Sequence, residues 1–257
     1  MTSFTYNGTD LSTLGKVTKV NYLDTPQRRG SNQTIPFQHG TAFSAKYYDE
    51  RHITLGLVIQ GTTAQDLEET LDTIKALVSP RAEKVLQMTM ENGDVRTANA
   101  SVDATFQTER NSALIARVVL DFTLSRPFWR GDATVNESVT VNTSPKTLLV
   151  TNTGTLEERN PVITLTGPLQ NTVLSNANGV SMTYTGTISG GDVVVITTNS
   201  WGEYTATENG ITNVIGNLSH NGSAAYMVLD VGLNTITITD STATTGEVQI
   251  EFDPPYL

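Results

Sequence analysis

Few side chains of this sequence have the type and spacing that catalysis or metal binding requires. His39, His52 and His220 are far apart, and none stands in an H-x-H or H-E-x-x-H arrangement. Glu157 and Glu158 could give a carboxylate to a glycosidase pair, but adjacent side chains of an extended chain point to opposite sides, and no partner acid is evident. The chain has no cysteine, which excludes disulfides, zinc–thiolate sites and cysteine nucleophiles. We therefore predict a protein that is not an enzyme and that holds no metal ion or other cofactor.

A short motif near the middle of the chain has two interpretations. Residues 126–132 read RPFWRGD and contain Arg130-Gly131-Asp132, the tripeptide that integrin-binding loops display. The amino-terminal residues lack the basic and apolar segments of a signal peptide, so we expect no encounter with an extracellular integrin. In the other interpretation a proline ends a strand and an aromatic cluster closes a domain. We favour this second interpretation, with Trp129, Arg130 and Gly131 as a domain junction.

Charge is distributed unevenly along the chain. Residues 1–130 hold 14 basic and 14 acidic residues, whereas the rest of the chain holds 2 basic and 12 acidic residues. The whole net charge of -10 therefore lies after Arg130. Such a break predicts two units with different surfaces, residues 1–131 and residues 132–257. Neither a balanced nor an acidic unit has the basic surface of a nucleic-acid binder, and no apolar run approaches the roughly 20 residues that span a membrane.

The first unit contains a single convincing helix. Thr62 and Gln65 have the spacing of a capping box, in which Thr62 is the N-cap, and Pro80 ends the run. Apolar residues then recur at helical spacing, namely Leu67, Leu71, Ile74 and Val78. One face of the helix must therefore pack on another element, which we expect to be a sheet.

Strands are predicted on both sides of that helix. Residues 52–61 and 84–90 have strand composition, and the Asn-Gly pair within residues 91–94 indicates a hairpin turn. Residues 114–124 alternate strictly, with an apolar face that runs from Leu114 to Leu124. Residues 21–50 show no sustained period of either kind, and a loop of that length is usually functional or awaits a partner.

After residue 132 the sequence changes to short threonine- and valine-rich strands separated by Gly, Asn and Ser. The predicted strands are residues 139–141, 147–151, 162–167, 192–197, 225–231, 234–239 and 247–252. Several short strands without a helix predict a β-sandwich or jelly roll. Trp201 and Tyr204 could form an aromatic platform for a sugar ring on this unit, but an aromatic residue that anchors a turn and lies half in the core is more common.

The order of several segments resembles the distal tail protein family of long-tailed, non-contractile bacteriophages. These segments are FTYNGTDL at 4–11, ERHITL at 50–55, the helical segment at 61–80, RPFWRGD, NPVITLTG at 160–167, VGLNTITI at 231–238 and the ending EFDPPYL. The resemblance covers nearly the whole chain. It implies a mainly β protein, with an N-terminal tail-tube-like β-sandwich or split barrel carrying one α-helix and a C-terminal sandwich similar to galectins and carbohydrate-binding modules.

The resemblance also implies a structural role at the tip of the virion tail. Family members form hexameric rings with a channel through which DNA passes without specific binding, and they contact the tail tube protein, a tail-associated protein and receptor-binding proteins. In some members of the family the C-terminal strand pairs back with the first unit, so the resemblance also implies that the segment 246–257 can return to the first unit here. Synthesis in the cytoplasm of the host bacterium is expected.

The subunit contacts of such a ring need exposed anchors. Residues 21–50 contain Arg28, Arg29, Tyr47 and Tyr48, and Arg and Tyr are enriched at protein interfaces. We therefore predict that these four residues lie at the contact between subunits. The alternative function is a carbohydrate-binding accessory protein that uses the C-terminal sandwich.

Overall fold

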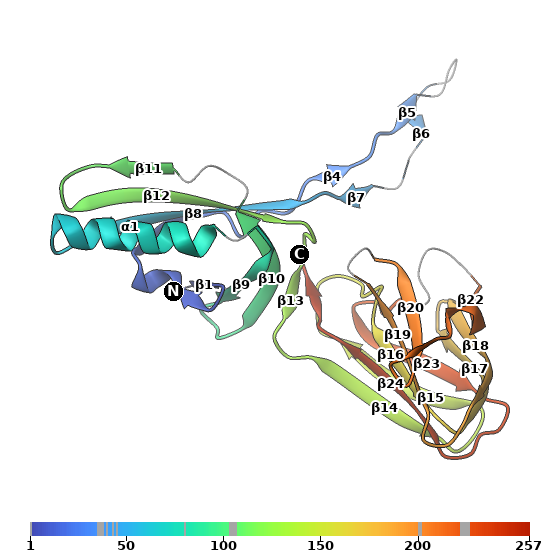
Figure 1. Ribbon diagram of the computed structural model, residues 1–257. Helices are drawn as coiled ribbons and strands as arrows, with labels where there is room; N and C mark the ends of the chain where they lie inside the picture. Colours follow the sequence, from blue (N-terminus) through green and yellow to red (C-terminus); the bar gives the residue numbers. More distant parts are fainter. Residues whose placement is uncertain are drawn as a thin grey trace. The chain divides into compact units, whose positions relative to one another are not determined.

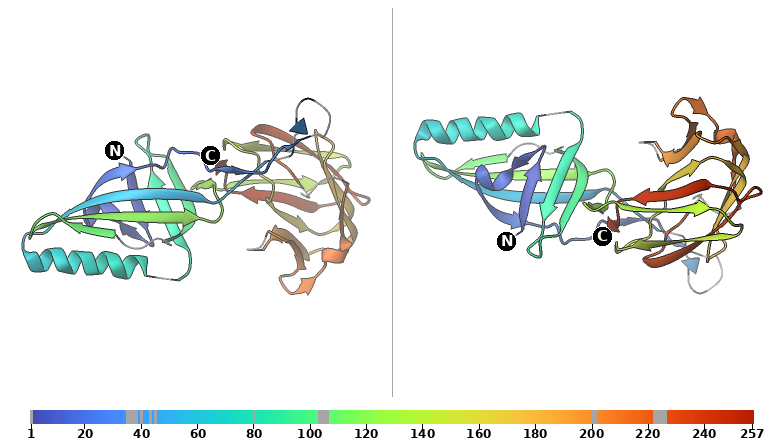
Figure 2. Two further views of the ribbon diagram at one scale, coloured as in Figure 1. Left: turned by 90° about the horizontal axis from the view of Figure 1, so that it is seen from above. Right: turned by 90° about the horizontal axis from the view of Figure 1, so that it is seen from below.

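The computed structural model describes residues 2–34, 39, 41–42, 44, 46–79, 81–102, 107–199, 202–221 and 227–257. The chain divides into two compact units, Met1–Asp132 together with Leu257, and Ala133–Tyr256. Both units are built almost wholly from strands, with one α-helix in the described chain (Figures 1 and 2). The predicted mainly β fold class is confirmed.

The first unit is a curled sheet with the strand order β2-β1-β9-β10-β12-β8-β3. Its curvature comes from β10, which pairs with β9 through Ala100 and then pairs with β12 through Ser101 and Val102. The elements are β1 (Ser3–Tyr6), β2 (Thr9–Asp10), the 3-10 helix η1 (Leu11–Thr13), β3 (Lys16–Val20), β8 (Arg51–Gln60), β9 (Lys84–Thr89), β10 (Val95–Val102), β11 (Gln107–Arg110), β12 (Ile115–Leu124) and β13 (Trp129–Gly131).

The centre of this sheet is the antiparallel pair of β8 and β12, which runs from Ile115 opposite Gln60 to Leu124 opposite Arg51. Alternate side chains of β12 are buried, as the sequence predicted, because one face of the pleated strand points into the core. The predicted strand is one residue too long, since Leu114 lies outside β12 and is 41% exposed.

Helix α1 (Ala64–Val78) buries three residues of the predicted apolar stripe, Leu67, Leu71 and Ile74. Its predicted N-terminus is wrong by one residue. Thr63 is the N-cap, and its hydroxyl accepts a hydrogen bond of 3.1 Å from the Asp66 N–H. The Asp66 carboxylate in turn accepts from the Thr62 N–H at 2.7 Å. Gln65 does not complete a capping box, because its amide donates to Glu69 on the helix surface.

The hairpin predicted from the Asn-Gly pair joins β9 to β10. The Met90 N–H donates to the Asp94 carbonyl at 2.8 Å and closes the turn. Gly93 has a φ of 92°, a conformation that glycine adopts without the steric cost of a side chain. The local signal in the sequence was sufficient here because a short turn depends mainly on the residues within it.

The second unit is a sandwich of two antiparallel sheets. One sheet has the order β14-β24-β16-β19-β20-β21 and the other β15-β23-β17-β18-β22. The elements are β14 (Val135–Val141), β15 (Lys146–Asn152), β16 (Val162–Thr166), β17 (Leu169–Asn176), β18 (Ser181–Ile188), β19 (Val193–Thr198), β20 (Tyr204–Glu208), β21 (Thr212–Asn213), η2 (Ile215–Asn217), β22 (Leu218–His220), β23 (Gly232–Thr239), β24 (Gly246–Phe252) and β25 (Pro255–Tyr256). The core lies between the sheets and contains residues of both, such as Ile163, Val248, Leu174 and Ile236.

One prediction about this unit needs correction. Of the strand predicted at 225–231, residues 225 and 226 lie outside the described residues, and residues 227–231 form no continuous strand. Leu229 makes an isolated bridge to Glu158, and the Asn234 side chain bonds the backbone of Asp230. Residues 246–252 form β24, which pairs with β14 and β16 inside the sandwich, and a return of the C-terminal end of the segment 246–257 to the first unit stays a prediction. Of the last residues, Leu257 groups with the first unit.

Candidate assembly surface

A two-stranded arm connects β3 to β8. The pair β4 (Arg28–Arg29) and β7 (Tyr47–Tyr48) is followed by the pair β5 (Gln33–Thr34) and β6 (Thr41–Ala42). We call residues 28–48 the arm, whose strands continue from the end of the β3–β8 pair in Figure 1. The loop predicted for residues 21–50 is therefore a paired hairpin in its described part. A hairpin requires only that its two strands pair with each other, so no periodic burial pattern is needed to form it.

The four predicted contact residues meet in this arm. Arg28 lies opposite Tyr48 and Arg29 opposite Tyr47 in the antiparallel register. Arg28 Nη2 donates to the Tyr48 hydroxyl at 2.8 Å, and its guanidinium carbon lies 4.9 Å from the centroid of the Tyr48 ring. Arg29 and Tyr47 are exposed, Tyr47 by 62%. The arm therefore presents one internally bonded Arg–Tyr pair next to a second pair that is open to solvent.

The arm is attached to residues that immediately precede the unit boundary. The Tyr48 ring meets Phe128 edge to face, with centroids 5.5 Å apart and an interplanar angle of 84°. This geometry is the favoured arrangement of two aromatic quadrupoles. This ring contact therefore joins β7 to the chain segment at the end of the first unit.

Arg51 fixes the other side of the attachment. It is 3% exposed, and its Nη2 donates to the carbonyl oxygens of Tyr22 at 2.6 Å and Asp24 at 2.7 Å. Its guanidinium carbon lies 5.9 Å from the centroid of the buried Trp129 ring. Burial lowers the pKa of Arg51 from its ordinary value; Asp24 opposes this effect and Arg96 adds to it. We call Tyr22, Asp24, Tyr48, Arg51, Phe128 and Trp129 the arm root.

Two donors of the arm root have no acceptor in the described part of the molecule. These are Arg51 Nη1 and Trp129 Nε1, both of which are buried. A buried donor without a partner costs free energy, so these two groups lower the stability of the arm root. Their unpaired state does not disturb the two carbonyl bonds that hold the chain between β3 and the arm.

A polar cavity of about 400 Å³ lies beside the arm root. It is lined by Asp24, Thr25, Pro26, Gln27, Asp49, Glu50, Arg51 and His52. Within it His52 Nε2 lies 3.2 Å from the Glu50 carboxylate, and His52 Nδ1 lies 3.2 Å from the Thr123 hydroxyl. No group of three metal-ligating side chains occurs here or elsewhere among the described residues.

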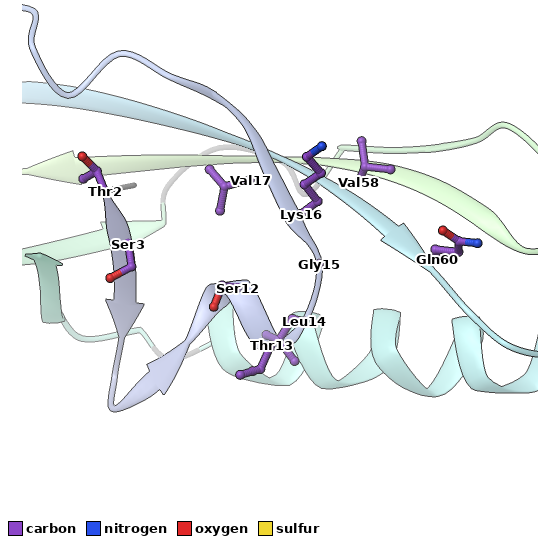
Figure 3. Close-up of a pocket in the computed structure, with 10 residues that line it drawn as sticks. All are labelled: Thr2, Ser3, Ser12, Thr13, Leu14, Gly15, Lys16, Val17, Val58 and Gln60. Carbon is purple, nitrogen blue, oxygen red and sulfur yellow. The ribbon is translucent and has the colours of Figure 1, made fainter. Parts of the chain in front are cut away.

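A larger cavity of about 680 Å³ lies between the strands at the two ends of the first sheet (Figure 3). Thr2 and Ser3 line it from the β1 side, Lys16 and Val17 from β3, and Gln60 from β8. Its lining contains neither a carboxylate nor a histidine. Lys16 is the titratable side chain of this lining.

Comparisons with known proteins point to phage tails. Residues 6–124 match the family described as the phage tail protein RIFT-related domain. The whole chain is similar in fold to the crystal structure of the Dit protein (gp 19.1) of phage SPP1, with a TM-score of 0.73 and 14% identity over 100% of both chains. Just under half of this chain therefore matches a phage tail domain. The resemblance to distal tail proteins that was inferred from the sequence is thereby confirmed, and at 14% identity the structural likeness is one of fold.

Two further phage tail structures are more distantly similar. The phage p2 baseplate in its activated conformation with Sr has a TM-score of 0.48 at 8% identity, and the same baseplate with Ca has 0.49 at 10%. Each match covers 98% of both chains, but at these scores neither carries an argument. No curated protein sequence matches the chain.

The remaining predicted residues lie in two places. Arg130 and Gly131 belong to β13 and pair with Thr97 and Arg96 of β10, so the RGD tripeptide begins in a strand of the first sheet. Trp201 lies outside the described residues. The Tyr204 hydroxyl donates to the Arg159 carbonyl at 2.9 Å and anchors the chain there. A sugar platform at these residues stays a prediction.

Sequence reasoning did not identify Arg51 or Phe128 as parts of the site. Arg51 is the first residue of a strand that was expected to begin at His52, a position where an arginine is usually solvated. The sequence does contain a signal that Arg51 is buried. Arg51 lies two and four residues before the apolar residues Ile53 and Leu55, so it shares their side of the strand and faces the core. No described helix is long and apolar enough to cross a membrane.

Proposed function

We propose that this phage tail protein is a distal tail hub that forms a hexameric ring between the tail tube and the tail tip. The observation that supports the proposal is the likeness of fold along the whole chain to the SPP1 Dit protein, which is described as a paradigm of the hub adsorption apparatus in phages that infect Gram-positive bacteria. In this proposal the first unit builds the ring and its channel. The second unit provides docking for receptor-binding or tail-associated proteins.

The charge distribution supports this division of roles. The first 130 residues carry equal numbers of acidic and basic residues, so neighbouring copies can approach without net repulsion. A channel wall without excess positive charge would let DNA pass instead of binding it. The protein would be made in the cytoplasm of the host bacterium and act at the tail tip of the virion.

The arm is the part of the first unit that we assign to the contact between copies. Arg29 and Tyr47 are exposed neighbours on paired strands, and a planar guanidinium beside an aromatic ring is a frequent anchor of interfaces. The arm root holds this pair in place through Tyr48 and Arg51. The contact surface is therefore presented by a supported hairpin.

The first test measures the mass of the purified full-length protein by light scattering coupled to size exclusion, with negative-stain images of the same fractions. We expect rings of six copies. The double variant Arg29→Glu, Tyr47→Ala should shift assembly to at least about tenfold higher concentration, because it removes an anchor and reverses a charge at a contact.

A matched control is Arg81→Glu with Ile211→Ala, which makes the same two kinds of change at exposed positions outside the arm. This control should assemble as the wild type does. A monomer at every concentration, without and with a tail tube partner, would refute the ring. Normal assembly of the arm variant would refute the arm as the contact.

A further inference from the structure

One face of the second unit differs from the rest of its surface. On the five-stranded sheet, β15 and β23 alternate strictly between buried and solvent-facing residues. The solvent-facing set on these two strands is Thr147, Leu149, Thr151, Leu233, Thr235 and Thr237. The register places them in rows, with Thr147 opposite Thr237, Leu149 opposite Thr235 and Thr151 opposite Leu233. These rows form a flat patch of methyl and hydroxyl groups.

Uncharged small side chains also cover this face on the next two strands. Val173 and Ser175 of β17 share this face, opposite Thr239 and Thr237 of β23. Thr183 and Ser181 of β18 lie beside them in the register. We call the solvent-facing side chains of β15, β23, β17 and β18 the neutral face, because none of those described carries a charge.

The absence of charge on this face is informative because the unit is strongly acidic. The chain after Arg130 contains 12 acidic and 2 basic residues. The opposite sheet carries acids on its own solvent-facing side, where Glu247 and Glu251 of β24 alternate with buried residues. Charge is therefore gathered on other parts of the unit and is absent from the solvent-facing side chains of four adjacent strands, since Lys146 of β15 shares the alternation of the buried residues. A merely solvated sheet face would show no such segregation.

Most of the exposed large apolar side chains of the unit lie on the neutral face or at its edge. Leu149 is 53% exposed and Leu233 66%, and Val231, which directly precedes β23, is 55% exposed. Leu149 and Leu233 are diagonal neighbours across the β15–β23 pair, within reach of each other. Of the described residues of this unit, Ile211 alone is a large exposed hydrophobic residue elsewhere. Apolar side chains gathered at one place on an otherwise polar surface mark an interaction site.

The composition of the face restricts its partner. A charged partner group would lose its hydration against this face and find no opposite charge. The described residues of the face include no aromatic ring on which a sugar could stack. The partner surface must therefore be neutral, flat and partly aliphatic, and the same face of another copy has these properties.

We propose that the neutral face is a docking surface for the neutral face of a second copy of this chain. Contact between two copies through most other surfaces of the unit would bring acidic side chains of both copies together. Through the neutral face, two acidic units can meet without negative charges facing each other. Two solvent-facing sheets that carry small residues can stack with their strands nearly aligned. The proposal goes beyond the ring, because it concerns the second unit and does not require the arm.

The size of the face sets the strength of the contact. Four strands about 4.8 Å apart and about seven residues long give a face of roughly 400 Å². A stable pair of proteins usually buries about 800 Å² on each partner. The contact is therefore weak on its own and is strengthened where an assembly holds several copies together, as multivalent contacts are.

The test is sedimentation velocity of the full-length protein over a concentration series. We expect an assembly step that doubles the mass at high concentration. The double variant Leu149→Lys, Leu233→Lys should move this step to at least about tenfold higher concentration, because it places four positive charges in the contact of two copies. The control Thr140→Lys, Ile211→Lys adds the same charges at exposed positions on the other sheet and should leave the step unchanged.

Cross-linking supplies an independent readout because the natural chain has no cysteine. The substitution Thr235→Cys places one thiol between the two leucines of the face. A short bis-maleimide should then yield a covalent dimer, whereas the Thr140→Cys variant should stay uncoupled. This result would separate a contact between identical faces from the ring contact, in which two different surfaces meet.

Two outcomes would overturn the proposal. One is a wild-type protein whose mass does not double at any accessible concentration, together with a Thr235→Cys variant that does not cross-link. The other is a doubling step that the Leu149→Lys, Leu233→Lys variant shares with the wild type. The mass at low concentration reports on the ring separately, so failure of the neutral face and failure of the hub are distinguishable.

Discussion

At the scale of single residues, buried polar groups of the second unit are tied into place by several bonds each. Asp240 is 4% exposed, and one of its carboxylate oxygens accepts from the Gln170 N–H at 2.7 Å and the Thr172 hydroxyl at 2.8 Å. Its other oxygen accepts from Thr242 and Ala243. This one carboxylate therefore joins the irregular start of β17 to the turn that follows β23.

The pH dependence of stability should reveal this carboxylate. Burial acts to raise the pKa of Asp240, but the hydrogen bonds from Thr242, Ala243 and Gln170 outweigh it and lower the pKa from its ordinary value. A lowered folded-state pKa contributes stability above the unfolded pKa of about 3.9, and this contribution is lost as the pH falls through the folded-state pKa. We expect Asp240→Asn to lower the free energy of unfolding at pH 7 by about 1–3 kcal/mol.

The measurement is urea denaturation followed by circular dichroism at neutral and at acidic pH. The difference between wild type and Asp240→Asn should shrink as the pH falls below the unfolded pKa of about 3.9 and through the lower folded-state pKa. Glu137→Gln, an exposed carboxylate on β14, should change stability little at either pH. A difference that is constant with pH would contradict the assigned role of the ionised group.

At the scale of elements, the arm depends on its root. Arg51 ties Tyr22 and Asp24 to the start of β8, and Tyr48 ties β7 to Phe128. The arm has little buried apolar surface of its own, since its described side chains are mostly exposed. Elements of this kind open locally more easily than the core of a sheet. Loss of the root should therefore release the arm before it affects the sheet.

Limited trypsin digestion measures this release, because the arm contains Arg28, Arg29 and Lys46. We expect Arg51→Met to raise the rate of cleavage within the arm by about tenfold, while the free energy of unfolding of the sheet and helix changes by only about 1–3 kcal/mol. Arg117→Met, at an exposed position on β12, serves as the control and should be cut like the wild type. Equal rates of arm cleavage in both variants would show that Arg51 does not hold the arm.

At the scale of the whole molecule, the two units differ in electrostatic self-repulsion. The first 130 residues are balanced, whereas the rest carries the entire net charge of -10. At 0.1 M ionic strength, salt screens the repulsion between exposed charges that lie more than about 10 Å apart. The second unit should therefore gain stability with salt, while the first should change little.

The two tryptophans allow each unit to be followed. In a Trp201→Phe variant Trp129 remains as the sole tryptophan, and it is buried in the first unit. Its fluorescence midpoint should stay within about 1 °C between low and moderate salt, while calorimetry of the same protein shows a second transition that rises by several degrees. A salt-dependent fluorescence midpoint would mean that the charge of the second unit acts on the first.

The sequence by itself determined the features that depend on neighbouring residues. The apolar stripe of α1, the alternation of β12 and the turn at Gly93 were all predictable, because periodicity and turn chemistry are local. The order of the segments was sufficient to indicate the distal tail protein fold. The exact N-cap was not predictable, because Thr62 and Thr63 are chemically equal candidates and the position of Asp66 decides between them.

Only the tertiary structure decided what distant segments do together. β17 and β18 were missed because their Asn, Ser and Gly residues disfavour strands locally, and pairing with β23 and burial of Leu174 and Met182 overcome that preference. The arm root joins residues 22, 51 and 129, and the neutral face joins strands from residue 147 to residue 239. Such surfaces arise from strand pairing and burial over the whole chain, which no short window of sequence contains.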